Sequence, residues 1–232
     1  IIPSDGRIYD ISGYRQSYKY FNDAEDIIRK TFVPKPHLLT IMKEILPHQY
    51  IAVHIRKGDY IKFIHKIPLL REFRRCQLAY YKEGIKKLRI NYPECPLLVC
   101  TDSPKWVLSI LSELDSKAIL APTVSNISPK FTDFIVLYQA NAVVISNSTF
   151  SWWASYLNPG RMIICPTPWW DPVGFIGTSM GLDGPYLHYP EWWLLDTDTG
   201  ETVRTPYSDN GNKQDNNYET LNIYRLIRGL LL

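Results

Sequence analysis

The sequence has almost no net charge and no long run of apolar residues. It holds 26 lysine and arginine residues against 23 aspartate and glutamate residues, which gives a net charge of +3. Broad nucleic-acid binding needs a concentrated basic face, so this balance argues against a nucleic-acid partner. A membrane-spanning helix needs about 20 consecutive apolar residues, and the sequence contains no such run. It also opens with no signal-peptide pattern.

Cysteine is scarce, and the four cysteines lack the Cys-x-x-Cys spacing of metal sites. Cys100 and Cys165 each end an apolar run, which predicts that they are small buried hydrophobic residues. Nothing requires an oxidising compartment, so we predict a cytoplasmic location. The chain begins at Ile1 and stops on a leucine run, and we expect it to be part of a longer polypeptide. A segment outside the chain could then supply a membrane anchor or a further lobe.

Several catalytic motifs are missing. The histidines show no HExxH spacing, and there is no GxSxG turn, Walker A loop or GxGxxG loop. Asp196-Thr197-Asp198 has the spacing with which some enzymes hold a divalent cation, but hard cations need several converging oxygen ligands. This stretch follows a tryptophan-rich run and precedes Gly200. We therefore predict a polar turn there, and no metal site.

What the sequence does contain is an alternation of apolar strands and helices from residue 49 onward. The predicted strands are 49–56, 97–101, 118–121, 142–146 and 161–165. The predicted helices are 69–91, 104–115, 131–141 and 149–157. The strands are rich in Val, Ile and Leu without alternating polarity, which is typical of strands buried on both faces. The pattern predicts an α/β fold with a doubly wound parallel sheet, Rossmann-like in kind.

The ends of the chain lie outside this alternation. Two helices are expected before it, one capped by Asn22 or Asp23 and one over 38–46, both packed on the core. After it we expect a polar loop and a last helix over 218–232, which crosses to another lobe or forms a dimer interface. The predicted division is a helical N-terminal segment, a Rossmann-like domain, and a loop with a C-terminal helix, over 1–48, 49–196 and 197–232.

The stretch from His54 to Tyr60 follows the first strand and carries Arg56, Lys57 and Asp59. Ligands of open α/β sheets bind beyond the carboxyl ends of the strands. A guanidinium at that place is a permanently charged, two-point donor for a phosphate. Gly58 is expected to let the backbone turn sharply.

The next turns carry carboxylates. Ser103 and Pro104 start a helix, which leaves Asp102 either to accept hydrogen bonds from a base or ribose or to serve as an ordinary helix-start residue. Thr132 is the expected cap of a later helix, with Asp133 in its first turn, where the helix dipole alone favours a carboxylate.

The last turn of interest is Ser146-Asn147-Ser148-Thr149, after which a helix begins at Phe150. Unpaired backbone N–H groups at a helix start, together with hydroxyl groups, form a natural phosphate site. This run of small polar residues exceeds what a helix cap requires. Trp152 and Trp153 are expected to form the wall of the site and part of the core, and not to bind the donor. Asn147 lies in a glycosylation sequon, but we expect it inside the site, where a glycan could not fit.

These two stretches carry a resemblance. His54–Tyr60 resembles the His-x-Arg-Arg-Gly-Asp-Tyr motif of the α-1,2-fucosyltransferase family, which is glycosyltransferase family 11. Ile145–Ala154 is similar to the second hallmark of that family almost letter for letter. Gly13–Ser17, which precedes both motifs, and the Thr101–Ser103 turn between them also match the order of the family, so the likeness covers most of residues 11–170.

The resemblance implies the nucleotide-sugar-binding half of a two-lobed, GT-B-type enzyme. Such an enzyme moves L-fucose from GDP-β-L-fucose to a glycan hydroxyl, galactose O2 in this family, with inversion and without a metal or other cofactor. Three departures stand out. Lys57 replaces the second Arg of the motif, the Gly-rich motif of the first lobe is absent before Ile1, and the Trp- and Pro-rich tail from Pro166 matches loosely.

Carried over by position, Arg56 holds the diphosphate and stabilises the departing GDP. Asp59 is the nearest carboxylate for the catalytic base, or it braces Arg56. His54 and Asp133 lie near the guanine. The residues assigned to donor binding are His54, Arg56, Lys57, Asp102, Ser103, Asp133, Asn147, Ser148, Thr149 and Phe150. Tryptophans of the tail stack on acceptor sugars or fill the core, and these are Trp169, Trp170, Trp192 and Trp193.

Two other classes of function stay open. One is a transferase for another nucleotide sugar. The other is a non-catalytic module that binds a nucleotide or a glycan, which the missing first lobe makes reasonable.

Overall fold

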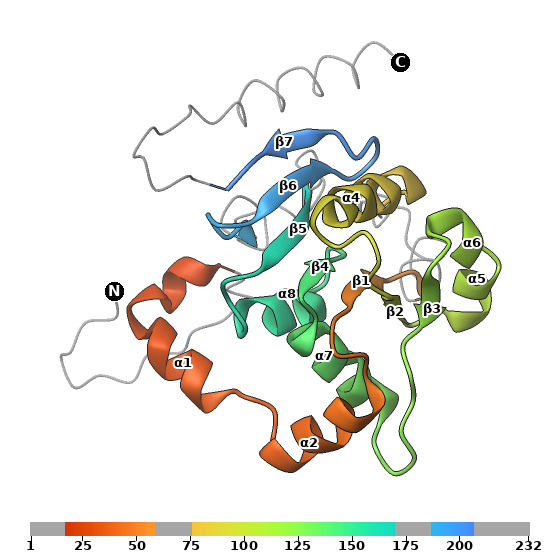
Figure 1. Ribbon diagram of the computed structural model, residues 1–232. Coiled ribbons are helices and arrows are strands. Elements are labelled where there is room, and N and C mark those ends of the chain that lie inside the picture. The colour runs from red at the N-terminus through yellow and green to blue at the C-terminus, as the bar shows by residue number, and fades with distance from the viewer. Residues whose placement is uncertain (1–16, 59–75, 170–186, 207–232) are drawn as a thin grey trace.

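The computed structural model describes residues 17–58, 76–169 and 187–206 (Figure 1). Within these ranges seven strands form one sheet, in the order β3-β2-β1-β4-β5-β6-β7. The strands are β1 (Ile51–Ile55), β2 (Leu97–Thr101), β3 (Ala118–Leu120), β4 (Ala142–Val144), β5 (Met162–Thr167), β6 (Trp193–Asp196) and β7 (Thr202–Arg204). All neighbours pair in parallel except β6 and β7, which are antiparallel.

Helices cover both faces of this sheet (Figure 1). The α-helices are α1 (Glu25–Thr31), α2 (Pro36–Ile45), α4 (Leu78–Asn91), α5 (Pro104–Leu108), α6 (Leu111–Leu114), α7 (Pro129–Gln139) and α8 (Thr149–Tyr156). Two 3₁₀ turns, Tyr18–Tyr20 and Asn22–Ala24, precede α1. None of the helices in the described part of the chain is long and apolar enough to cross a membrane.

The core lies in two layers, one on each face of the sheet. Ala52 and Val143 belong to the layer beneath α2, α7 and α8, whereas Val53 and Val144 belong to the layer beneath α4, α5 and α6. All five residues of β1 are buried. Strands that lose water from both faces need apolar side chains at every position, which accounts for their continuous apolar sequence. The predicted doubly wound parallel sheet is confirmed.

The strand order creates a switch point. From β1 the chain proceeds outward to β2 and β3, then returns to place β4 on the other side of β1. The order 3-2-1-4-5-6 is that of doubly wound nucleotide-binding sheets, whose ligands lie beyond the carboxyl ends of the two strands at this reversal. Here those two strands are β1 and β4.

Several predicted boundaries are wrong. The helix expected over 104–115 is interrupted and forms α5 and α6. The helix expected from residue 131 begins at Pro129, with Ser128 as its N-cap residue, because a proline at the first helical position is already fixed near helical φ. Thr132 is therefore not a cap but a buried residue inside α7, and Asp133 lies beyond the first turn.

Two strands were not predicted. The strands β6 and β7 are only four and three residues long, and polar residues flank them. The sheet continues to Arg204, whereas the predicted domain ended at residue 196. The division at residues 48 and 196 stays a prediction. The expected loop beyond residue 206, the helix over 218–232 and the first part of the helix over 69–91 lie outside the described residues.

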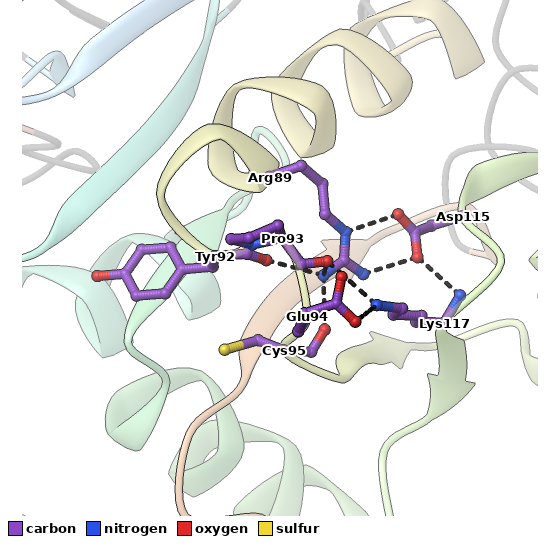
Figure 2. Close-up of polar contacts among 7 residues, drawn as sticks. All are labelled: Arg89, Tyr92, Pro93, Glu94, Cys95, Asp115 and Lys117. Atoms are coloured by element: carbon purple, nitrogen blue, oxygen red, sulfur yellow. Dashed lines mark hydrogen bonds and ion pairs between the residues drawn. The ribbon is translucent and has the colours of Figure 1, made fainter.

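At the amino-terminal edge of the sheet, a polar network joins the end of α4 to the strands β2 and β3 (Figure 2). Arg89 donates from Nε and Nη2 to the two carboxylate oxygens of Asp115, over 2.8 and 2.7 Å. Its Nη1 donates to the carbonyl oxygens of Tyr92 and Cys95. Lys117 pairs with Glu94 and gives its backbone N–H to Asp115. This network stabilises the segments just before β2 and β3, at the opposite end of the strands from their carboxyl ends.

The network predicts a pH-dependent stability. Burial alone would raise the pKa of Asp115, but hydrogen bonds from Arg89 and the Lys117 amide outweigh it, and the pKa lies below its ordinary value. Because the unfolded pKa is about 3.9, the stabilisation is complete above that pH and is lost as pH falls through the lower folded pKa. Asp115→Asn should lower the free energy of unfolding by about 2 kcal/mol near pH 7. Urea unfolding should show that difference shrinking below about pH 4.

The matched control is Glu113→Gln, because Glu113 is an exposed carboxylate of α6 with one long ion pair to Lys82. Exposed pairs contribute little, so its unfolding free energy should stay within about 0.5 kcal/mol of the original at each pH. A difference between the original protein and Asp115→Asn that stays constant from pH 7 to pH 3 would contradict the assignment.

Candidate functional site

The turns after β1 and β4 meet beyond the sheet at the switch point. The strands are direct parallel neighbours, with Ile51, Ala52 and Val53 paired to Ala142, Val143 and Val144. Their carboxyl ends therefore lie together. Arg56 extends across this gap, and its Nη1 donates a hydrogen bond to the Ser148 hydroxyl over 3.1 Å. The two stretches that the sequence singled out are thus in contact.

The start of α8 is arranged to leave its polar groups on the site side. Ser148 is the N-cap residue, with extended backbone angles, but its side chain makes no capping hydrogen bond. Its hydroxyl instead accepts from Arg56. The first hydrogen bond along the helix runs from the Trp152 N–H to the Ser148 carbonyl, so the N–H groups of residues 149–151 precede it. A guanidinium beside such N–H groups is a suitable place for an anion.

His54 lies behind this turn and is only 6% exposed. Its Nδ1 is 2.7 Å from the Ser146 hydroxyl, and its ring is 5.5 Å from the Phe150 ring. Burial lowers the pKa of His54 to about 4. The imidazole is therefore neutral near pH 7, and it supports Ser146 and Phe150 from the interior.

Asp133 approaches the carboxyl end of β2 from α7. Burial raises the pKa of Asp133 to about 7, although hydrogen bonds with the Cys100 thiol and the Thr101 backbone amide act in the opposite direction. A carboxyl group that titrates near neutral pH can both donate and accept hydrogen bonds, and such shifted groups gather at functional sites. Because Asp133 is not in the first turn of α7, the helix dipole does not account for its presence.

The turn after β1 also contacts the turn that follows β2, on the side away from β4. The Asp102 carboxylate accepts hydrogen bonds from the backbone N–H groups of Lys57, at 2.9 Å, and of Gly58, at 3.1 Å. Ser103 donates to the same carboxylate over 3.2 Å. The Lys57 ammonium lies 3.3 Å from the centre of the Trp106 ring. Arg56 and Lys57 therefore extend toward opposite neighbours of β1.

Asn147 faces inward rather than toward the surface. It is 2% exposed, its Nδ2 donates to the Trp169 carbonyl over 3.4 Å, and its Oδ1 accepts a long contact from the Cys76 thiol. These contacts attach the turn after β4 to the end of β5 and the start of α4. A buried side chain in this position has no room for a glycan, and the contact of Asn147 with the donor stays a prediction.

An apolar cavity of about 530 Å³ adjoins the first turn of α8. It is lined by Phe32, Phe134, Thr149, Phe150, Trp153 and Leu157. Trp153 is thus a wall residue, whereas Trp152 is 3% exposed and belongs to the core. No pattern in the sequence indicates this cavity, because its walls come from three separate helical segments.

Some predicted residues do not reach the site. Trp169 and Trp192 are buried at 1% and 3% exposure, so they fill the core and do not stack on a ligand. Asp59 and Trp170 lie outside the described residues, as do Gly13–Gln16.

The chain turns directly after Asp196, the last residue of β6. The Asp196 carboxylate accepts the backbone N–H groups of Asp198 and Thr199 over 2.9 and 3.0 Å. The described ranges contain no group of three or more His, Cys, Asp or Glu residues placed to hold a metal ion.

Taken together, the switch-point position, the guanidinium and the helix start are the features expected of a phosphate-binding site in a doubly wound nucleotide-binding domain. The model of the family "Glycosyl transferase family 11" matches residues 2–172, and the chain belongs to that family.

Individual relatives are more distant. The chain is 26% identical over 164 residues to an alpha-1,2-colitosyltransferase of Escherichia coli, covering 68% of this chain and 55% of that protein. It is 25% identical to galactoside alpha-(1,2)-fucosyltransferase 1 of Mus musculus, covering 66% of this chain and 42% of that protein. The chain spans about half the length of these curated relatives. A solved structure of the E. coli heptosyltransferase WaaC with ADP has a TM-score of 0.45 and 15% identity, over 84% of this chain and 55% of that one.

Proposed function

We propose that this chain is the donor-binding half of a fucosyltransferase. The enzyme would move L-fucose from GDP-β-L-fucose to a hydroxyl group of a glycan acceptor, galactose O2, with inversion and without a metal. The observation that carries the proposal is the contact between Arg56 and Ser148, which joins a permanent cation to a helix start at the switch point. The family membership and the fucosyltransferase among the relatives support it.

The reaction explains why these groups are needed. The acceptor oxygen attacks the anomeric carbon of fucose, the bond from that carbon to the diphosphate oxygen breaks, and its electron pair stays on GDP. Negative charge therefore grows on the diphosphate. Without a metal, fixed donors must stabilise that charge, and in this proposal Arg56 and the N–H groups at the start of α8 do so, supported by the contact between Arg56 and Ser148. The acceptor proton passes to a base, for which Asp59 is the proposed residue.

The remaining assignments come from the family resemblance. Asp133 and the neutral His54 would lie near the guanine, and Phe150, whose ring is 5.5 Å from that of His54, would contact the phosphate or the fucose. Thr149 would contact the phosphate or the sugar from the first turn of α8. Lys57 extends toward β2, so in this proposal it adds positive charge to the turn without sharing the two-point contact of Arg56.

One observation favours a second donor. The relative with 26% identity is an alpha-1,2-colitosyltransferase, so a colitose donor is the alternative to GDP-fucose. A module that binds the nucleotide without catalysis is the other alternative, because the chain spans about half of its relatives.

A nucleotide panel tests the proposal. GDP at one hundred times its dissociation constant should stabilise the protein by about 2.7 kcal/mol, which raises the melting temperature by roughly 5–10 °C. UDP and dTDP at the same concentration should leave it nearly unchanged. A larger shift with UDP or dTDP would contradict the choice of GDP.

Catalysis needs a second measurement. Incubation with GDP-fucose and a series of galactosides should release GDP in proportion to the fucosylated product, detected by mass spectrometry. A protein that binds GDP but releases none under these conditions is a binding module. Release from a colitose donor alone would identify the alternative substrate.

A further inference from the structure

The turn that carries Arg56 is attached to the neighbouring strand connection by its backbone. Asp102 Oδ1 accepts the N–H groups of Lys57 and Gly58, and Oδ2 accepts the Gly58 N–H as well, over 2.9–3.1 Å. The Ser103 hydroxyl also donates to Oδ1, over 3.2 Å. The two residues that follow Arg56 are thus fixed to the connection between β2 and α5.

A second attachment comes from the side chain of Lys57. Its ammonium lies 3.3 Å from the centre of the Trp106 ring in α5, a distance at which a cation is attracted to the face of an indole. Asp102 and Trp106 therefore hold the same turn, one by its backbone and one by a side chain.

Gly58 makes this close approach possible. A Cβ atom on Gly58 would lie 3.3 Å from both Asp102 Oδ2 and the Ser103 hydroxyl oxygen, which is tighter than most Cβ contacts. Gly58 is not among the described residues with positive φ. The glycine is needed here for the proximity of Asp102 and not for an unusual backbone angle, which corrects the expectation from the sequence.

We propose that Asp102 is a positioning residue that sets the direction of Arg56, with Trp106 as its second support. The inference rests on the proposed function, in which Arg56 binds the diphosphate. The turn is held on its β2 side, while Arg56 reaches from it to Ser148 on the β4 side. A rotation of the turn would carry the guanidinium away from Ser148, and a displacement of about 1 Å can cost on the order of 10² in rate.

This role differs from the one predicted by the sequence, in which Asp102 binds the ribose or base of the donor. A positioning residue acts only through Arg56, whereas a ligand contact acts by itself. Residues that share one effect show non-additive losses, and independent residues show additive losses. The two roles can therefore be separated by a double-mutant cycle.

The cycle compares the original protein, Asp102→Ala, Arg56→Lys and the double variant. Asp102→Ala should lower kcat about 10- to 100-fold with a smaller change in KM, and it should cost little more once Arg56 is replaced. Asp102→Asn keeps an acceptor oxygen for the two N–H groups and should recover part of the rate. Losses that multiply in the double variant would overturn the proposal in favour of a direct donor contact.

A readout without substrate keeps the proposal separate from the proposed function. Hydrogen exchange measured by mass spectrometry should be about tenfold faster at Lys57 and Gly58 in Asp102→Ala, and somewhat faster in Trp106→Leu. Glu113→Gln removes an exposed carboxylate from the same β2–β3 crossover and should leave exchange unchanged. Faster exchange in a protein that binds no GDP would refute the donor assignment and leave the attachment standing. Unchanged exchange in Asp102→Ala would refute the attachment itself.

Discussion

Replacement of Arg56 by alanine is expected to lower the rate of fucosyl transfer by about 10²–10³-fold, the loss typical of removing one donor to a developing anion. The guanidinium is a permanent cation that contacts Ser148 at the start of α8. In the proposed function, its loss leaves the N–H groups of the helix to stabilise the departing GDP without it. Initial rates with GDP-fucose and the best galactoside, together with GDP titration by calorimetry, measure the effect.

Two further variants test which property of Arg56 accounts for the loss of rate. Arg56→Lys keeps the charge but not the planar two-point geometry, so it should recover only part of the rate. Ser148→Ala removes the acceptor of the Arg56 hydrogen bond and should have a smaller effect than Arg56→Ala, because the backbone N–H groups of α8 remain. Lys86→Ala removes an exposed cation from α4 and should change nothing. Equal turnover in Arg56→Ala and the original protein, at equal folded fraction, would contradict the proposed role of Arg56 in stabilising the departing GDP.

The meeting of the two turns could be predicted because it follows from parallel pairing. Continuous apolar runs identify buried strands, and the carboxyl ends of parallel strands share one edge of the sheet. Polar residues immediately after β1 and β4 therefore had to lie at that edge. The sequence alone does not show that β1 and β4 are direct neighbours in the sheet, because that depends on the order of all the strands.

The directions of individual side chains could not be predicted in this way. Arg56 and Lys57 are adjacent in the sequence, yet one extends toward Ser148 and the other toward Trp106. Successive side chains after a strand point in different directions, and their partners come from segments far apart in the sequence. For the same reason the sequence leaves Asp102 as either a donor contact or a helix-start residue, and it does not show that the Asp102 carboxylate accepts the backbone of another turn.

Local signals also compete with one another. At α7 both Ser128-Pro129 and Thr132 are plausible starts, and the proline prevails because its φ suits the first helical position. The strands β6 and β7 are too short to show a period, and β7 pairs with β6 at the edge of the described sheet. Short edge elements of this kind depend on their neighbours more than on their own residues.

Arg161 has a structural role that no pattern in the sequence indicates. It follows α8 in the chain, and its guanidinium donates to four backbone carbonyls at the ends of α7 and α8. The acceptors are the carbonyl oxygens of Leu137, Ala140, Ala154 and Asn158, at 2.7, 2.6, 3.0 and 3.1 Å. Burial lowers the pKa of Arg161 to about 10, so the group keeps its charge at neutral pH. A cation at two helix C-termini is also favoured by both helix dipoles.

Arg161→Met is therefore expected to lower the free energy of unfolding by about 3–4 kcal/mol, since each carbonyl that loses a charged donor costs about 1–3 kcal/mol and water replaces some of the bonds. Urea unfolding at pH 7 measures the loss. Arg161→Lys should recover less than half of it, because an ammonium cannot reach four carbonyls in a fixed fork. Lys130→Met makes the same change of charge at an exposed position of α7 and should stay within about 0.5 kcal/mol. A loss below about 1 kcal/mol in Arg161→Met would show that the carbonyls find other donors. In that case α8, and the anion site at its start, would not depend on this residue for their position.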